Sequence, residues 1–258
     1  MDFASIVGIF WGVAMLMVGN ALEGGSVKSM LGKSAFIIVI GGTSGAILLQ
    51  FSIKTVMAAV LGLKDVFLGV KLDSEELIHQ IVEFARRARR EGILALEKEI
   101  PNIQSPFFSK ALGMAVDGLE PKTLCETMET EIASVEEEWK EKSEVWEAAG
   151  GYLPTVGIIG AVLGLIIVMG NLSDIERVGE GIASAFVATI YGVGAANMIC
   201  LPVGNKLKRI GKHIARHHEM TLKGVLLIQE GINHSIIEEQ LKGYLDEKAR
   251  EKYVSAGG

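Results

Sequence analysis

The sequence predicts an all-α, polytopic membrane protein with four transmembrane helices and a helical cytoplasmic domain. Hydrophobic residues make up 49% of the 258-residue chain and the mean hydropathy is +0.36, yet 22% of the residues are charged. A chain lying wholly in lipid would not carry so many charges, and such a high hydropathy is unusual for a water-soluble one. The composition therefore indicates a protein that lies partly in the bilayer and partly in water.

Four apolar stretches are long enough to cross the membrane as helices. A hydrocarbon core of ~30 Å takes about 20 mostly apolar residues in helical form. The stretches run over about residues 3–22, 34–53, 152–170 and 179–203. Helices are expected rather than strands, because a helix satisfies its own backbone hydrogen bonds in lipid. The first stretch has no basic residue before it, so we interpret it as a retained membrane helix and not as a signal peptide.

The spans predict four segments along the chain. Residues 1–54 hold the first two spans, and residues 55–150 form a cytoplasmic helical domain. Residues 151–203 hold the last two spans, and residues 204–258 form a cytoplasmic helical tail.

The distribution of Lys and Arg orients the spans. Basic residues follow the second and fourth spans, whereas the loop after the third span carries only Arg177; the basic residues are Lys54, Lys64, Lys206, Lys208, Arg209 and Lys212. Lys28 and Lys33 in the first turn give a weaker signal in the opposite direction. By the positive-inside rule, the middle segment, the tail and both termini are cytoplasmic.

The cytoplasmic segments have helical periodicity. Asp73 or Ser74 can cap a helix in which apolar residues recur every three or four positions. A second helix is expected to begin near Pro121. Its apolar stripe, which requires a partner helix that the tail can supply, consists of Leu124, Met128, Ile132, Val135 and Trp139.

The four spans contain no Asp, Glu, Lys, Arg or His, and Glu180 lies only at the edge of the last one. Carboxylates within the membrane are the usual carriers of protons or sodium ions. If this protein handles ions, the titrating group must therefore come from another chain.

The third and fourth spans contain small and neutral polar residues instead. Glycines that can bring a neighbouring helix close are Gly157, Gly160 and Gly164. Pro154 and Pro202 each remove a backbone donor near the cytoplasmic end, and we expect the two to lie at matching depths. Thr155 and Thr189 add hydroxyl groups. Glycines in membrane helices mostly serve packing, and a membrane Thr usually bonds its own helix, but the combination suggests a hydrated path or a deformable hinge.

These residues resemble a known family. The stretches YLPTVGIIGAVLGL and AFVATIYG, with ICLPVGNKLK after them, are similar to the third and fourth membrane helices of the MotA-type stator proteins, in the MotA/TolQ/ExbB family. The two-plus-two arrangement of spans also matches, whereas ExbB and TolQ have three spans. The segment RRARREGILALEKE resembles the cytoplasmic stretch of the family that faces the flagellar rotor.

The resemblance implies a ring of five subunits in the bacterial inner membrane around two helices of a MotB-type partner. An Asp of the partner would carry the ion, H+ or Na+, with no other cofactor, and the ring would drive a FliG-type rotor protein. By position, the residues of the ion pathway and its gating would be Pro154, Thr155, Ala161, Thr189 and Pro202.

The resemblance also places rotor-binding residues in the cytoplasmic domain. Arg89 and Glu97 match the family's charged pair, and Arg90 belongs to the same basic patch. The alternative is that this patch is simply a solvated helix face. Opposite charges on a partner would be steered to such a patch.

The ion is left open between proton and sodium. Ala161 and Ala188 stand where sodium-type relatives tend to have Thr, which favours a proton, because sodium requires oxygen ligands. Thr155, Thr189 and the Thr-Ile-Tyr-Gly pattern at 189–192 keep sodium possible.

Other functions have less support. The net charge of −6 argues against nucleic acid as a partner. His213, His217 and His218 have no HExxH pattern, so no metal site is expected. Cys125 and Cys200 are expected to be unpaired. We find no catalytic cluster and predict no enzyme. The alternative to a stator subunit is an ExbB/TolQ-like energising subunit of an envelope transport complex.

Overall fold

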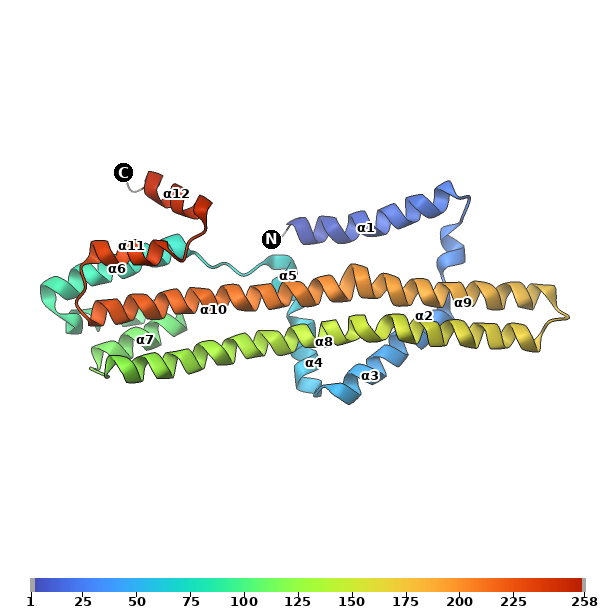
Figure 1. Ribbon diagram of the computed structural model, residues 1–258, viewed down its shortest axis with the longest axis horizontal. Helices are drawn as coiled ribbons and strands as arrows, with labels where there is room; N and C mark the ends of the chain where they lie inside the picture. Colours follow the sequence, from blue (N-terminus) through green and yellow to red (C-terminus); the bar gives the residue numbers. More distant parts are fainter. Residues whose placement is uncertain (1–2, 257–258) are drawn as a thin grey trace. The chain divides into compact units, whose positions relative to one another are not determined.

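The computed structural model describes residues 3–256, and every regular element in that range is helical (Figure 1). By their packing, the residues form two compact units. Unit 1 comprises Met1–Val70 and Trp139–Ile210, and unit 2 comprises Lys71–Glu138 and Gly211–Gly258. Four described helical segments are long and apolar enough to cross a membrane, which confirms the predicted number of spans. The limits of the four sequence segments stay a prediction, because the units are defined by packing and not by membrane boundaries.

The first two spans lie in unit 1. The first is α1 (Phe3–Leu22), and the second is built from several shorter elements. In order, the elements of the second span are η1 (Val27–Met30), α2 (Lys33–Phe36), the π-helical η2 (Ile37–Gly41) and α3 (Gly42–Gln50). Two short helices, α4 (Ile53–Leu61) and α5 (Leu63–Leu68), follow the span. The second span ends at Gln50, three residues earlier than expected. The Ser52 hydroxyl accepts a hydrogen bond from the backbone of Thr55 and so begins a separate helix.

The third span is the end of one long helix, α8 (Pro121–Gly170), which begins at Pro121 as predicted and continues through Pro154. The fourth span begins with α9 (Ile175–Ala195). It continues through the π-helical η5 (Ala196–Cys200) into α10 (Leu201–Gln229). The fourth span therefore contains a segment with one extra residue per turn, directly before Pro202.

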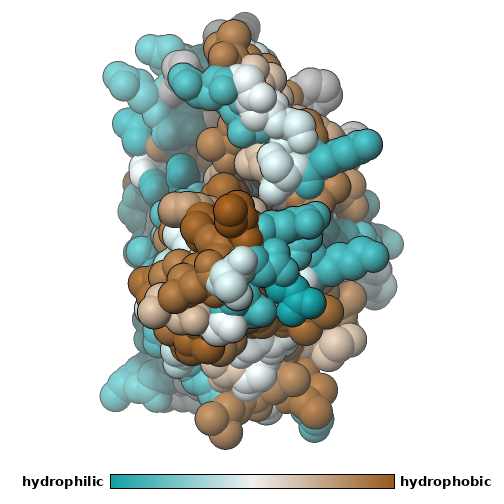
Figure 2. Space-filling view, turned by 90° about the vertical axis from the view of Figure 1, so that its right-hand side faces the viewer, coloured by the Kyte–Doolittle hydropathy of each residue, from teal (hydrophilic) through white to brown (hydrophobic). Residues whose placement is uncertain are grey.

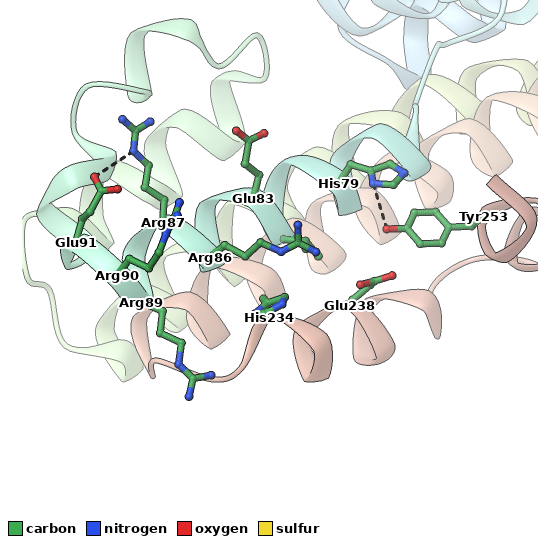
Figure 3. Close-up of a pocket in the computed structure, with 11 residues that line it drawn as sticks. His79, Glu83, Arg86, Arg87, Arg89, Arg90, Glu91, His234, Glu238 and Tyr253 are labelled. Carbon is green, nitrogen blue, oxygen red and sulfur yellow. Dashed lines mark hydrogen bonds and ion pairs between the residues drawn. The ribbon is translucent and has the colours of Figure 1, made fainter. Parts of the chain in front are cut away.

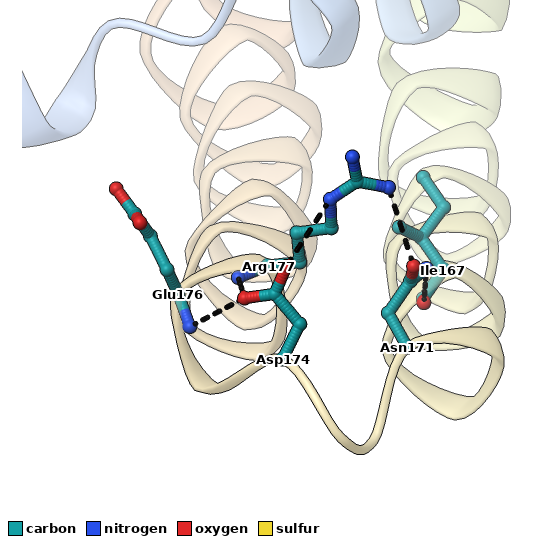
Figure 4. Close-up of polar contacts among 5 residues, drawn as sticks. All are labelled: Ile167, Asn171, Asp174, Glu176 and Arg177. Carbon is teal, nitrogen blue, oxygen red and sulfur yellow. Dashed lines mark hydrogen bonds and ion pairs between the residues drawn. The ribbon is translucent and has the colours of Figure 1, made fainter.

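The turn between α8 and α9 is shorter than the predicted loop of residues 171–178. Asp174 accepts hydrogen bonds from the backbone of Glu176 and Arg177, which starts α9 at Ile175 (Figure 4). Asn171 donates its side-chain amide to the Ile167 carbonyl at 2.8 Å and receives a bond from Arg177 at 3.4 Å. These contacts bond one of the free carbonyl groups at the end of α8 and two of the free amides at the start of α9.

Apolar side chains surround this turn. Met169, Leu172 and Ile175 are 69%, 63% and 87% exposed. Figure 2 looks onto the right-hand side of Figure 1 and shows brown, apolar surface in the middle of that face, with teal side chains beside it. Water is therefore a poor environment for this surface.

The start of the second span packs against the fourth. The Tyr191 hydroxyl donates to the Met30 carbonyl at 2.8 Å and accepts from the Gly32 amide at 3.2 Å. The hydroxyl oxygens of Ser34 and Ser184 lie 3.4 Å apart. These contacts place the turn between the first two spans beside the middle of α9. The beginning of α9, next to the α8–α9 turn, extends beyond it.

Unit 2 is a helical bundle with one apolar core. The remaining elements are α6 (Ser74–Glu91), η3 (Ile93–Leu96), η4 (Ile100–Asn102), α7 (Pro106–Val116), α11 (His234–Lys242) and α12 (Glu247–Ala256). Asp73 caps α6, as predicted. The core joins the predicted stripe residues Leu124, Met128 and Ile132 to residues of α10 that include Val225. The tail thus supplies the expected partner helix.

Candidate functional site

The backbones of α8 and α9 are in direct contact in the membrane part. A Cβ atom built on Gly157 would lie 3.0 Å from the Ala188 carbonyl oxygen, and one on Gly164 would lie 2.8 Å from that of Gly181. A Cβ atom on Gly160 would meet the Ala188 methyl at 2.9 Å. Each of the three predicted glycines therefore lies where no larger residue fits without movement.

Two further glycines of α9 complete this contact and were not predicted. A Cβ atom on Gly192 would lie 2.5 Å from the Leu153 carbonyl oxygen and 3.1 Å from the Gly157 Cα atom. A Cβ atom on Gly181 would meet Val168 at 2.7 Å. The sequence signal was the matching set of small residues on both helices, which becomes informative only when the pairing register is known.

The two predicted hydroxyl groups bond their own helices. Thr155 is exposed and donates to the Tyr152 carbonyl at 2.8 Å. Thr189 is half-buried and donates to the Ala185 carbonyl at 3.3 Å. Because a hydroxyl oxygen keeps lone pairs after donating its proton, both oxygens can still accept a bond from water or contact a cation.

The two prolines do not lie at matching depths. A Cβ atom on Gly150 would meet the Leu201 side chain, next to Pro202, whereas Leu153, next to Pro154, lies against Gly192. Along α8, Gly150 and Pro154 are four residues apart, which is about one helical turn or ~6 Å. Of the two prolines, Pro202 lies nearer to the parts of α8 and α10 that continue into unit 2. The prediction of matching depths was wrong because the pairing of α8 with α9 and α10, which sets the depth of each proline, cannot be derived from the sequence of either helix alone.

The two alanines at the sodium-type positions have different surroundings. Ala161 is half-buried on α8. Ala188 is 1% exposed and its methyl group faces Gly160 in the helix contact. Within one subunit, Ala188 therefore lines the packing surface and does not share a face with Ala161.

Arg89 and Arg90 lie in the last turn of α6 and line a broad cavity of about 1250 Å³ in unit 2 (Figure 3). The lining also contains Arg86, His234 from α11 and Tyr253 from α12. Tyr253 is 4% exposed and its ring stacks on that of His79 at 4.6 Å. Four arginines face three glutamates, Glu83, Glu91 and Glu238, so the cavity between the three helices has a net basic lining.

Glu97 is exposed but lies just beyond η3 and does not line this cavity. Gly92, at φ +85°, allows the chain to reverse between α6 and η3. Arg87 connects the two sides of the reversal, since its guanidinium contacts Glu99 and lies 3.6 Å from Glu91. Among the four arginines at the end of α6, which are Arg86, Arg87, Arg89 and Arg90, Arg87 thus has a structural role that the sequence did not indicate.

The comparisons with known proteins agree with this arrangement. Residues 99–220 match the model of the MotA/TolQ/ExbB proton channel family. The chain is 35% identical over 258 residues to motility protein A of Bacillus subtilis (strain 168), covering 100% of this chain and 96% of that protein. The chain belongs to the MotA/TolQ/ExbB proton channel family. It is a membrane protein and a flagellar stator subunit of this family, and not an enzyme.

Two solved stator structures are similar over almost the whole chain. The structure of C. jejuni MotAB superposes with a TM-score of 0.92 at 35% identity and covers 96% of this chain and 97% of that one. The flagellar MotAB stator complex from Bacillus subtilis gives a TM-score of 0.90 at 35% identity, with 98% and 99% covered. This match over both membrane pairs favours the stator hypothesis over the ExbB/TolQ alternative.

The three histidines considered as metal ligands, His213, His217 and His218, lie on α10 in the helical bundle of unit 2. The His218 ring stacks on Phe107 at 4.0 Å, and burial lowers the pKa of both His217 and His218. Neither His217 Nε2 nor His218 Nδ1 has a hydrogen-bond partner. Within residues 3–256, no cluster of three or more His, Cys, Asp or Glu side chains is arranged to hold a metal ion. Cys125 and Cys200 are both free, as expected.

The buried histidines predict a loss of stability in acid. A lowered pKa in the folded state means that the unfolded chain binds more protons, so stability falls as the pH drops below about 6.5. Each histidine can lower the free energy of unfolding by at most about 1.4 kcal/mol per pH unit. Unfolding midpoints of the purified protein at pH 7.5 and 5.5 test this. His218→Phe should reduce the difference between the two unfolding midpoints. If the double variant His217→Phe, His218→Phe showed the same difference as the wild type, the two histidines would not be its cause.

Proposed function

We propose that this chain is a ring subunit of the stator, with five copies around two membrane helices of a MotB-type partner. The observation that carries the proposal is the absence of any Asp, Glu, Lys, Arg or His from residues 3–22, 34–53, 152–170 and 181–203. The ring then offers no ion carrier of its own, and the partner supplies an Asp within the membrane. The MotAB complexes that superpose on this chain support a partner of that kind.

In this proposal, ion passage turns the ring, and the ring drives a FliG-type rotor protein. Thr155, Ala161 and Thr189 face the ion pathway, and Pro154 and Pro202 act in its gating. Gly157, Gly160 and Gly164 hold α8 and α9 together, which the backbone contacts support. The charged rotor surface consists of Arg89, Arg90 and Glu97, of which the first two line the basic cavity.

We further propose an inner-membrane location with both termini and unit 2 in the cytoplasm, from the Lys and Arg that follow the second and fourth spans. The transported ion is a proton. Ala161 and Ala188 offer no side-chain oxygen at the two positions where sodium-type relatives tend to have Thr. A proton needs only a carboxylate and water, whereas sodium needs several oxygen ligands.

The test is swimming speed in a stator-deleted cell that carries this chain and its partner. A proton uncoupler should stop swimming, while replacement of sodium by potassium should leave the speed unchanged. Speed that follows the sodium concentration and survives the uncoupler would overturn the choice of ion. Cells that assemble flagella and the complex but never swim under any condition would overturn the stator proposal itself.

Reversal of charge at the rotor surface should separate torque from ion flow. Arg89→Glu is expected to lower swimming speed several-fold, because Arg89 is exposed and lines the basic cavity, while ion flux through the assembled complex is retained. Lys122→Glu, an equally drastic reversal on an exposed side chain of unit 2 away from this cavity, serves as the control. Equal loss of flux and speed in Arg89→Glu would indicate misfolding instead.

A further inference from the structure

The cavity between α6, α11 and α12 holds more positive charge than its own acidic side chains balance. Two of its three glutamates already have cationic partners. Glu91 lies 3.6 Å from Arg87. Glu238 lies 3.0 Å from Lys242, which is not part of the lining. Among the described lining residues, Glu83 alone is left to offset the other three arginines.

These three arginines are Arg86, Arg89 and Arg90. Within the described part of the chain, none of them forms a hydrogen bond or an ion pair. They are spaced at i, i+3 and i+4 on α6, so they lie on the same side of that helix, and all three are exposed. Neighbouring cations without counter-ions repel one another. An anion that contacts more than one of them would therefore be bound favourably.

The start of α11 adds positive potential at a second wall of the cavity. Asn233 caps α11 by accepting a hydrogen bond from the backbone of Ser235 at 3.1 Å, and the helix begins at His234, which lines the cavity (Figure 3). The first turn of this nine-residue helix contains no acidic residue. The partial positive charge of a helix N-terminus is thus added to that of the arginines on α6.

We propose that this cavity binds an oligophosphate, which is the charged part of a small molecule with two or more linked phosphate groups, through Arg86, Arg89 and Arg90. Its volume of about 1250 Å³ is ample, since ligand pockets commonly measure about 300–1,000 Å³. A guanidinium group matches the oxygens of a phosphate in a bidentate geometry. A phosphate group carries about −1.5 to −2 charge at pH 7, whereas a carboxylate carries a single charge. Linked phosphates therefore fit three adjacent arginines better than the separate carboxylates of a peptide.

This site goes beyond the proposed rotor surface, because it adds Arg86 and the start of α11 to Arg89 and Arg90. Binding of the anion does not depend on torque or on the choice of ion. A bound oligophosphate would neutralise Arg89 and so weaken the contact with the rotor. That consequence rests on the proposed function, whereas the binding itself does not.

Titration calorimetry of the purified complex at low salt tests the site, with pyrophosphate as the probe and orthophosphate for comparison. The wild type should bind pyrophosphate more tightly than orthophosphate. Arg86→Gln should weaken the binding of pyrophosphate by about tenfold or more, because it removes a hydrogen bond between charged groups. Lys122→Gln is the matched control, since Lys122 is an exposed cation of unit 2 that does not line the cavity. Arg86 has no partner to lose within the described residues, so Arg86→Gln should unfold at the same temperature as the wild type.

A titration with ADP distinguishes the two sources of an oligophosphate. Tighter binding of ADP than of pyrophosphate would identify a nucleotide as the ligand, and equal binding would show that the site recognises the phosphates alone. Equal affinity for pyrophosphate in wild type, Arg86→Gln and Lys122→Gln would overturn the site. Tighter binding of a tetraglutamate peptide than of pyrophosphate would overturn the choice of ligand and assign the cavity to a protein partner. A complex that supports swimming but binds neither pyrophosphate nor ADP would refute this inference and leave the proposed function in place.

Discussion

Replacement of Gly192 by alanine is expected to force α8 and α9 apart and to destabilise the subunit by about 1–3 kcal/mol, the usual cost of overpacking. The added methyl group would lie 2.5 Å from the Leu153 carbonyl oxygen, which belongs to the backbone of α8 and cannot rotate away. The thermal unfolding midpoint of the purified complex should fall by several degrees. Swimming should be lost with it, because both helices belong to the proposed ion pathway.

Gly194→Ala is the matched control for this change. Gly194 lies on the same helix, two residues further on, and a Cβ atom there would meet nothing within 4 Å. Because alanine favours a helix more than glycine, this variant should be as stable as the wild type or slightly more stable. If both alanine variants had the same unfolding midpoint, the direct backbone contact between α8 and α9 would be refuted.

Pro154→Leu and Pro202→Leu are expected to abolish swimming while the complex still assembles. Proline lacks a backbone donor, so it leaves a carbonyl one turn earlier without its helical bond and makes the helix easier to deform. Leucine restores that donor and favours the helix by up to about 3 kcal/mol. The variants should therefore unfold at the same temperature as the wild type or higher, even though torque is lost.

A proline outside the membrane provides the comparison. Pro106 is the first residue of α7, where a helix needs no donor, so Pro106→Leu should leave swimming intact. Assembly is checked by co-purification with the partner. Normal swimming in either membrane variant would exclude that proline from gating, and loss of co-purification would assign it to assembly instead.

The number of spans and the caps of the cytoplasmic helices could be predicted because they depend on local properties of the chain. An apolar run of about 20 residues predicts a membrane helix wherever it occurs. Asp73 caps α6 through a bond to a residue only three positions away. The stripe that begins at Leu124 follows the helical period and needs only some apolar partner, which α10 provides.

The pairing within the membrane could not be predicted in the same way. Gly192 meets Leu153 and Gly157, yet which residues face one another depends on the register between α8 and α9. That register changes where η5 adds one residue per turn, which no composition pattern reveals. The offset of Pro154 and Pro202 follows from this pairing, which only the structure shows. Arg87 likewise could not be distinguished from its neighbours until the chain reversal brought Glu99 to it.

The position of the turn between the first two spans has a consequence for the end of the α8–α9 hairpin. Ser34 meets Ser184, nine residues after α9 begins at Ile175, so the α8–α9 hairpin rises about 14 Å above the start of the second span. The first two spans of the same subunit therefore do not cover the end of this hairpin. Its exposed apolar side chains must be covered by lipid or by another chain. A subunit that has not yet assembled is therefore expected to aggregate through this surface.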